Sequence, residues 1–282
     1  MNKLFLPLFV LLYFTALPQV QAQLQMRGVE VGPWVGTAVY FGDLNTDFKL
    51  NRPGLAGGIG ARYNFNHRLA VKASVNYGRI EAYDSDSDNP FELNRNLSFQ
   101  NDVLDGTLQL EFNFLNYIHG HREYWFTPYA FAGISAFTHS PKTIADDGRT
   151  VSLRELGTEG QMRGDEYAII NMAVAGGVGF KWDITYEISM DISAGIRAGG
   201  TDYLDDVSTS YPDRSDLLRN RGRDAFELYD RSLMVNQEGE RIDRAGEQRG
   251  DDTVKDVYIF AGFGVNYYFG DVRCPGLGGK RR

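Results

Sequence analysis

Alternating carboxylates are the most suggestive chemical feature of the chain. The run Asp84-Ser-Asp86-Ser-Asp88-Asn89 places acidic side chains as the start of a calcium-binding loop does. Such a loop also needs Gly at its sixth position and a bidentate Glu at its twelfth. Those positions hold Asn89 and Arg95, so we expect a solvated acidic loop here.

A second acidic group, formed by Asp202, Asp205 and Asp206, is close enough in sequence to gather a divalent ion. Three neighbouring carboxylates are weak evidence without further ligands. The pair His119-Gly-His121 places two imidazoles on one side of an extended segment, as a zinc site would. Since neither Cys nor another His lies nearby, we expect a wet turn. The chain therefore predicts no metal and no cofactor.

Nucleophilic catalysis requires a hydroxyl, a base and an acid in the right geometry. His139-Ser140 stands at the end of a predicted strand, and with an acid from elsewhere it would suit a Ser-His-acid esterase acting on lipid A. Such triads are defined by geometry and not by adjacency. We favour a non-catalytic role, and an enzyme of this kind is the alternative.

Cys274 is the single cysteine. A leftover cysteine in an exported protein suggests a disulfide with a partner or a free thiol. It lies in a tail, residues 271–282, that contains Pro275 and three glycines. A tail of this composition cannot readily bury the thiol, so Cys274 is the candidate partner-binding residue.

The N-terminus predicts export. Lys3 precedes an apolar run from Leu4 to Leu17, and small residues before Gln23 suit a signal peptidase. Residues 1–22 are therefore interpreted as a signal peptide, and their removal with Lys3 changes the formal charge from −8 to −9. This acidity argues against nucleic acid as a partner, because phosphates favour basic surfaces.

Alternation of apolar and polar residues with a period of two dominates the mature chain. It predicts eight strands, each long enough for the roughly 9–11 residues of a tilted membrane strand. With 32 Gly, 16 Tyr and 18 Phe, the composition fits an outer-membrane barrel with aromatic girdles. The predicted strands are residues 29–41, 55–65, 69–77, 104–114, 125–137, 168–182, 186–198 and 257–269.

The predicted connections alternate in length. Short gaps near residues 66–68, 116–123 and 183–185 alternate with long polar ones, at 42–51, 80–98, 138–167 and 199–255. Outer-membrane barrels have short periplasmic turns and long extracellular loops. The sequence thus predicts an all-β, eight-stranded antiparallel transmembrane β-barrel over residues 23–270, in the cell outer membrane with lipid around it.

Closure is required because an unpaired strand edge in hydrocarbon costs several kcal/mol per group. Eight strands leave an interior that side chains fill. A soluble β-sandwich is the rival fold, against which the long apolar faces argue. In the strand at 125–137 we expect Tyr129, Phe131 and Phe137 on the outer side. A mixed-charge lumen network is predicted from Arg62, Lys72, Glu111, Lys181, Glu187, Asp191 and Arg197.

The excursion at 199–255 is too long for a simple connection, and loops of this length are usually functional or disordered. Its apolar side chains predict a short amphipathic helix or a cap over the barrel mouth. They are Leu217, Leu218, Phe226, Leu228 and Tyr229.

Three motifs resemble the PorG-type barrels of Bacteroidetes, which are associated with the type IX secretion system. They are Gly42-Asp-Leu-Asn45 after the first strand, Thr201-Asp-Tyr-Leu-Asp-Asp-Val-Ser208 after the seventh, and Tyr268-Phe-Gly270 followed by Cys274-Pro275. The resemblance extends over most of the mature chain. The second motif is distinctive, whereas the first by itself is weak.

The resemblance implies an outer-membrane anchor for a periplasmic ring made of PorK-like lipoproteins and PorN-like partners. It also implies that the barrel holds no translocation pore. By this analogy the periplasmic turns and Cys274 would make the contact. Because the family recurs in several copies per genome, membership does not guarantee the secretion role, and a surface adhesin is a third hypothesis.

Overall fold

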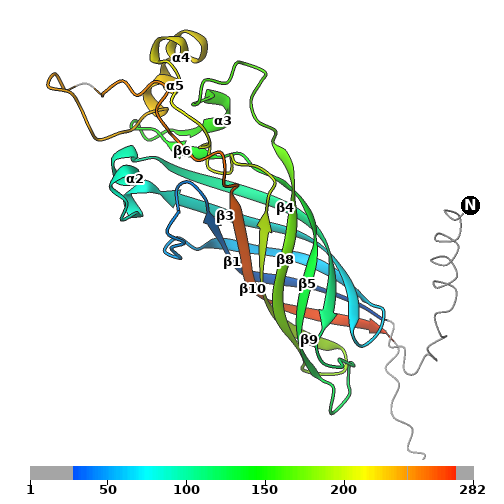
Figure 1. The fold of residues 1–282 in the computed structure, drawn as a ribbon. Helices are drawn as coiled ribbons and strands as arrows, with labels where there is room; N and C mark the ends of the chain where they lie inside the picture. The colour runs from blue at the N-terminus through cyan, green and yellow to red at the C-terminus, as the bar shows by residue number, and fades with distance from the viewer. Residues whose placement is uncertain (1–27, 240, 271–282) are drawn as a thin grey trace, which may run out of the picture.

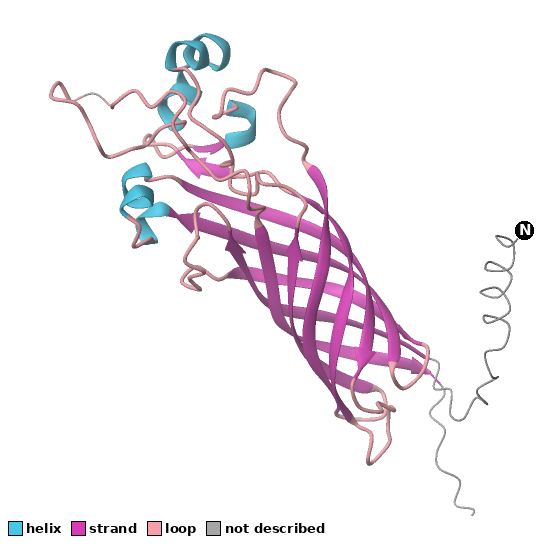
Figure 2. Ribbon diagram, in the orientation of Figure 1, coloured by secondary structure: helices cyan, strands magenta, loops and turns pink. Residues whose placement is uncertain are grey.

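The computed structural model describes residues 28–239 and 241–270. The predicted signal peptide and the tail with Cys274 lie outside the described residues. Eight strands form a closed antiparallel barrel, which confirms the predicted fold (Figures 1 and 2). They are β1 (Gly28–Phe41), β2 (Gly54–Asn64), β3 (Leu69–Tyr83), β4 (Ser98–Asn113), β5 (Phe126–Thr138), β8 (Ile170–Asp183), β9 (Ile188–Ala198) and β10 (Val257–Gly270).

The barrel closes where β3 pairs with β4, so all eight strands have two neighbours. Successive paired residues, followed once around the barrel from Val103, return to β4 at Asn113, a stagger of 113 − 103 = 10 residues. Strands this strongly tilted, eight in number, enclose a space that side chains fill. The sequence pattern therefore leads to a packed interior.

The outer surface is apolar along the strands, as a lipid environment requires. Large apolar side chains are exposed there, among them Leu55, Ile134 and Val174. Aromatic side chains gather at the end with the short turns. They are Phe65, Phe112, Phe114, Trp125, Phe180, Tyr186, Tyr267 and Phe269. This arrangement is an aromatic girdle at one membrane interface.

One prediction about side-chain direction is wrong. Tyr129, Phe131 and Phe137 are buried inside the barrel, and Ile134 of the same strand faces out. Both faces of β5 are apolar, so alternation alone could not choose between them. The inner face was decided by partners, because Tyr129 packs under the ammonium of Lys181, 4.3 Å from its ring centre.

The hairpin of β3 and β4 is longer than predicted. Residues 80–98 were expected to form a loop, but pairing continues to Tyr83 and Ser98. Only the tip is irregular, with the 3-10 helix η1 (Asp84–Asp86) and α2 (Pro90–Arg95). The hairpin thus projects beyond the lipid-facing part of the barrel (Figure 1).

The remaining long connections fold together over this end of the barrel, and we call residues 139–169 and 199–256 the cap (Figure 2). It contains β6 (Lys142–Ile144), β7 (Thr150–Ser152), α3 (Leu153–Leu156), α4 (Arg214–Arg221) and α5 (Arg223–Leu228). The predicted helical segment is present as α4 and α5, with Leu217 and Leu228 buried and Leu218 exposed. Among the described helices, none is long and apolar enough to span a membrane.

Candidate functional site

The centre of the lumen is an ion-pair network around Arg62. Its guanidinium donates to Glu30 at 2.7 Å and to Glu111 at 2.8 Å. Lys181 donates to the same Glu111 carboxylate at 2.5 Å. All four side chains are nearly inaccessible to solvent. Buried charges of this kind need partners, because an unpaired charge in a low-dielectric interior is strongly destabilising.

Most of the predicted lumen residues lie inside the barrel. Arg62, Glu111, Lys181, Asp191 and Arg197 are buried. Of these, Asp191 lies 3.8 Å from Arg62, and Arg197 lies 3.9 Å from Asp105. The half-buried Lys72 lines a small internal cavity beside Asp191.

Glu187 is the exception and corrects the prediction. It is exposed in the turn before β9, because that strand begins at Ile188 and not at Tyr186. Its position in the alternation matches the inward Ser189 and Asp191, and its carbonyl oxygen still accepts from the Tyr268 amide at 2.7 Å, but its side chain is exposed. Glu30, which the prediction omitted, belongs to the network. The sequence does contain a signal for this role, because Glu30 is the single carboxylate on the inward row of the first predicted strand.

His119 occupies the short-turn end of the lumen, contrary to the predicted wet turn. Its Nε2 lies 3.1 Å from Glu30 and its Nδ1 lies 2.9 Å from Asp183. Its ring stacks on that of Tyr268 with centres 4.1 Å apart. Burial opposes the charged imidazole, but hydrogen bonds to Asp183 and Glu30 outweigh it and raise the pKa of His119 to about 9. His119 is thus a cation that closes the lumen at its short-turn end, which we call the floor.

The space left in the lumen is small. The internal cavity beside Lys72 and Asp191 measures about 30 Å³. A single water needs roughly 10–15 Å³ by the same measure. The cavity therefore has room for about two waters, and it does not form a continuous aqueous channel.

At the opposite end, a short polar cluster fastens the cap to the barrel. The Tyr40 hydroxyl, at the end of β1, lies 2.6 Å from Asp205 and 2.8 Å from Asp256. A hydroxyl has one hydrogen to donate, so one of these contacts requires a protonated carboxyl that donates to the Tyr40 oxygen. We call Tyr40, Asp205 and Asp256 the cap joint.

The motif residues after the first and seventh strands converge on this joint. Leu44, Leu204 and Val207 are buried together in one apolar cluster with Tyr40. Asp43 accepts hydrogen bonds from the Asp251 amide at 3.1 Å. The two motifs therefore contact each other through the cap, although about 150 residues separate them in the sequence.

Electrostatics at the joint favour protonated acids. Burial, with repulsion from Asp256 and Asp43, raises the pKa of Asp205 well above its ordinary value. Burial likewise raises the pKa of Asp256, and it raises that of Asp43 to about 7. Asp202 is nearby, where it accepts a hydrogen bond from Ser208 at 2.6 Å. In the described part of the chain, no group of three His, Cys, Asp or Glu side chains has the geometry of a metal site.

Two buried arginines hold the cap together and join it to the loops of β1–β2 and β3–β4. Arg95 donates both to Asp84 and to the carbonyl oxygens of Asp43 and Arg249. Arg249 donates to Glu159 at 3.0 Å and also to the carbonyl oxygen of Asp206. Each guanidinium thus joins several loops that are distant in the sequence. Arginine suits this role because it presents five donors on a rigid plane.

The Arg95 contact corrects the expected solvated acidic loop at Asp84, whereas the Asp88 side chain is exposed as expected. Asp84 is fully buried, and its carboxylate accepts from Arg95 at 2.7 and 2.8 Å and from the Leu97 amide at 2.8 Å. Arg95 stands where a calcium loop would have its twelfth-position Glu. Its guanidinium supplies the positive charge that the buried carboxylate requires.

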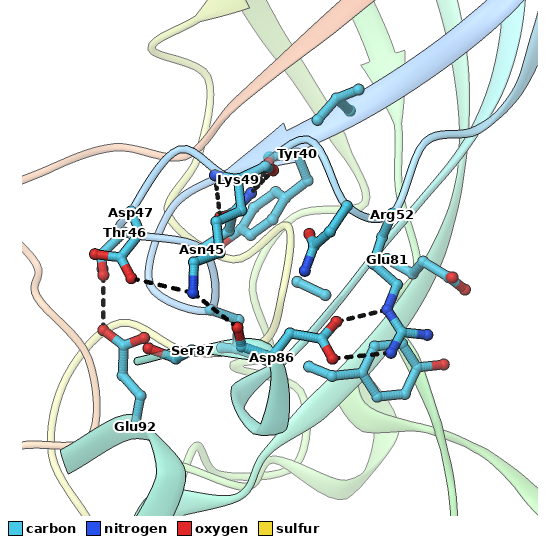
Figure 3. A pocket seen from close by; sticks show the side chains of 15 residues that line it. Tyr40, Asn45, Thr46, Asp47, Lys49, Arg52, Glu81, Asp86, Ser87 and Glu92 are labelled. Atoms are coloured by element: carbon cyan, nitrogen blue, oxygen red, sulfur yellow. Dashed lines mark hydrogen bonds and ion pairs between the residues drawn. The ribbon is translucent and has the colours of Figure 1, made fainter. Parts of the chain in front are cut away.

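A polar pocket lies between the loop at 42–53 and the tip of the β3–β4 hairpin (Figure 3). Arg52 pairs with Asp86 through two hydrogen bonds, and Thr46 donates to Glu92 at 2.7 Å. Its free volume is about 20 Å³, enough for about one water. The pocket is therefore a joint between two segments and has no room for a small-molecule ligand.

The candidate base His139 has no catalytic partner among its described hydrogen bonds. Its Nε2 contacts the Ala168 carbonyl oxygen at 3.1 Å and the Asn171 amide at 2.9 Å. Its ring is stacked against Tyr167, and burial lowers its pKa to about 4. The backbone amide of Ser140 donates to the side-chain oxygen of Asn101. The geometry gives His139 a packing role.

A closed antiparallel barrel with an apolar outside and a charge-filled inside defines the class of outer-membrane β-barrel proteins. Within that class, residues 2–221 match the family described as a domain of unknown function, DUF6089. The chain belongs to this family. No curated protein matches it.

Several solved barrels are similar in fold. OprG of Pseudomonas aeruginosa is 11% identical, with 87% of this chain and 97% of that chain covered and a TM-score of 0.41. The Neisserial surface protein A is 11% identical over 86% and 97%, with a TM-score of 0.40. Ail of Yersinia pestis is 11% identical over 86% and 97%, with a TM-score of 0.38.

Proposed function

We propose that the protein is a non-catalytic outer-membrane anchor that ties a periplasmic ring of the type IX secretion kind to the membrane. The observation that carries the proposal is the filled lumen. Arg62, Glu111 and Lys181 occupy its centre and His119 closes its floor. A barrel built in this way offers its outer wall and its two ends to other molecules.

The secretion role itself rests on the motif resemblance, which implies a partnership with PorK-like and PorN-like ring proteins. The chain enters β1 at Gly28 and leaves β10 at Gly270, and both points lie at the short-turn end (Figure 1). In outer-membrane barrels that end faces the periplasm. Gly270, the last described residue before Cys274 in the sequence, therefore lies on the side where a periplasmic ring would be.

The first two motifs, residues 42–45 and 201–208, lie at the other end. Asp43, Leu44 and Leu204 are interior parts of the cap joint and its surroundings. We therefore assign these two motifs to folding of the cap, and we assign docking to the periplasmic turns and the tail. This division makes the docking proposal testable without disturbing the motifs at residues 42–45 and 201–208.

The test is affinity purification of the tagged protein from membranes solubilised in a mild detergent. We expect ring proteins to co-elute with the wild type. A Cys274→Ser variant, run beside it on non-reducing gels, should lose any high-mass species that depends on a disulfide. Co-elution of no periplasmic protein from either form would contradict the anchoring role, whereas unchanged high-mass bands would contradict only the covalent link.

Absence of catalysis is tested separately. A His139→Ala variant should leave the lipid A of its host unchanged by mass spectrometry, because the contacts of His139 are to Ala168 and Asn171. A Ser140→Ala variant is the matched second change. Loss of a lipid A modification in both variants would replace the anchor with an esterase.

A further inference from the structure

The loop between β1 and β2 exposes two large apolar side chains. Phe48 is 70% exposed and Leu50 is 69% exposed, values close to the 79% of Leu55 at the start of β2. Leu55 faces lipid on the barrel wall. The similar exposure of Phe48 and Leu50 is unusual for a loop whose other residues are mostly polar.

The loop is held in place by hydrogen bonds. The Asn45 side chain accepts from the Lys49 amide at 2.9 Å and donates to the carbonyl oxygens of Tyr40 and Lys49. The Lys49 ammonium donates to the Asp86 carbonyl oxygen at 2.9 Å, and Arg52 pairs with the Asp86 carboxylate (Figure 3). Polar neighbours on both sides are thus fixed, and Phe48 and Leu50 project away from the pocket.

The backbone conformation supports this reading. Phe48 has φ = 53°, one of three positive values at non-glycine residues in the described chain. A bulky residue rarely adopts the left-handed region. Asn45 closes the turn that imposes it, and the result is an aromatic ring directed outward.

The exposed pair continues the lipid-facing surface of the barrel. The ring of Phe48 packs on that of Phe41, with centres 5.2 Å apart. Phe41 belongs to the outward row of β1, with Val35 and Val39, and is itself covered, at 7% exposed. Phe48 therefore takes the outermost place in this row, at the long-loop edge of the barrel.

We propose that Phe48 and Leu50 form an apolar finger that inserts into lipid at the long-loop interface of the membrane. Continuity with the barrel wall identifies lipid as the occupant. Aromatic side chains are favoured at such interfaces, and most of the exposed ones on this barrel lie at the opposite end. The finger gives the long-loop end an interfacial anchor that β1 and β2 lack within their strands. The inference depends on the membrane barrel and not on the secretion role.

The test uses spin labels on the full mature chain in a Cys274→Ser background, reconstituted in phosphatidylcholine vesicles. Single cysteines replace Phe48 and Leu50 in turn. Leu55→Cys serves as the lipid-facing reference, and Leu218→Cys on the outermost helix α4 serves as the aqueous reference (Figure 1). Collision rates with oxygen and with a nickel chelate give the depth of each label.

We expect the labels at Phe48 and Leu50 to collide with oxygen and avoid nickel as the Leu55 label does. Depths nearer to that of Leu218 at both positions would overturn the proposal. Spin–spin broadening that disappears on dilution with unlabelled protein would show a second copy as the occupant and would also overturn it. Leu50→Cys keeps the test decisive if a label at Phe48 disturbs the left-handed turn.

Discussion

The short-turn end of the barrel is closed by side chains of the barrel and its turns, with His119 at their centre, whereas the long-loop end is covered by two long segments of chain. His119 enters the lumen from a short turn and is held by Glu30 and Asp183. The cap is held by Tyr40 and by the buried arginines Arg95 and Arg249. The comparison teaches that the floor belongs to the barrel's own charge network, while the cap is a separate layer attached at a few polar points.

The two ends also differ in their contact with the membrane. The short-turn end carries a girdle of aromatic side chains on the barrel wall, with Phe114, Trp125 and Phe269 among them. At the long-loop end, the exposed aromatics of the β1–β3 wall are Tyr77 and the loop residue Phe48. Because the girdle is built into strands and turns, the floor is fixed in depth by the barrel, and the cap requires its own attachment.

The largest expected effect is loss of Arg62. An Arg62→Met variant leaves Glu30 and Glu111 without their main partner, and breaking a buried ion pair costs about 3–5 kcal/mol. We expect the urea concentration at the midpoint of unfolding in vesicles to fall accordingly. Unfolding is monitored by heat-modifiable gel mobility. Lys72→Met removes a half-buried lumen cation and is the control. Equal losses in both variants would contradict a network centred on Arg62.

The second change separates the cap from the barrel. Arg95→Met removes the donor to Asp84 and to two loop carbonyls. Breaking this buried pair should cost about 3–5 kcal/mol locally, which raises amide exchange in the cap more than roughly hundredfold. Exchange in the strands and the heat-modifiable mobility should stay at wild-type values.

The matched control for Arg95 is Arg219→Met on α4, where the side chain is exposed and pairs only with Asp216 at 3.4 Å. Surface pairs of this kind contribute about 0–1 kcal/mol. If Arg95→Met unfolded the strands together with the cap, the cap would be part of the barrel's cooperative unit and the comparison would fail.

The third effect is pH dependence of the cap. The raised pKa values of Asp43, Asp205 and Asp256 mean that the protonated forms stabilise the joint. This stability is fully present below about pH 4, the ordinary aspartate pKa, and is lost as the pH rises through the pKa of about 7 at Asp43. Protection of the cap amides, after correction for the intrinsic rise of exchange with pH, should therefore fall by up to roughly tenfold per pH unit for each group that titrates.

Other charged and titratable groups also face the joint from the surrounding segments. They are Arg95, Asp202, Asp251 and Lys255.

An Asp256→Asn variant retains a hydrogen-bonding amide in place of the acid, and it should flatten the pH dependence. Asp252→Asn, an exposed neighbour in the same loop, should leave the dependence intact. The floor should weaken later, because the pKa of His119 is raised to about 9 and its stabilising charge is lost only as the pH passes that value. A floor that loosens before the cap would reverse the order predicted here.

The smallest effect is expected at Glu187. Because it is exposed in the turn before β9, a Glu187→Gln change should alter stability by less than about 0.5 kcal/mol. Glu111→Gln, the same substitution on a buried carboxylate bonded to Arg62 and Lys181, should cost several times more. Similar unfolding midpoints for the two variants would place Glu187 in the network after all.

Strand positions were predictable because each strand alternates between lipid and lumen. In β4, for example, the exposed Leu104, Leu108 and Leu110 alternate with buried Asp105 and Gln109. This contrast marks both the strand and its direction. In β5 the contrast is absent, since Tyr129 and Phe131 face a lumen that is partly aromatic, and the face could not be chosen from the pattern.

The ends of the barrel were less predictable for a different reason. His119 and Asp84 stand in segments whose composition indicates solvent exposure, yet both are buried. The partners of His119, Glu30 and Asp183, are distant in the sequence, whereas Asp84 is paired with Arg95, eleven residues along the chain. Neither Asp183 beside His119 nor Arg95 beside Asp84 has a local signature that marks it as a buried partner. The acids of the Thr201–Ser208 motif were visible as a group, but Tyr40 and Asp256, which complete the joint, were not.

The sequence by itself determined the strand period, the even number of strands and the requirement for closure. These follow from local alternation and from the cost of unpaired backbone groups in lipid. Tertiary structure alone decided which charges pair across the lumen, that His119 enters the floor, and that the cap is fixed through Tyr40. Those contacts depend on the stagger of the closed barrel, which brings Glu30, Arg62 and Glu111 to one level from three different strands.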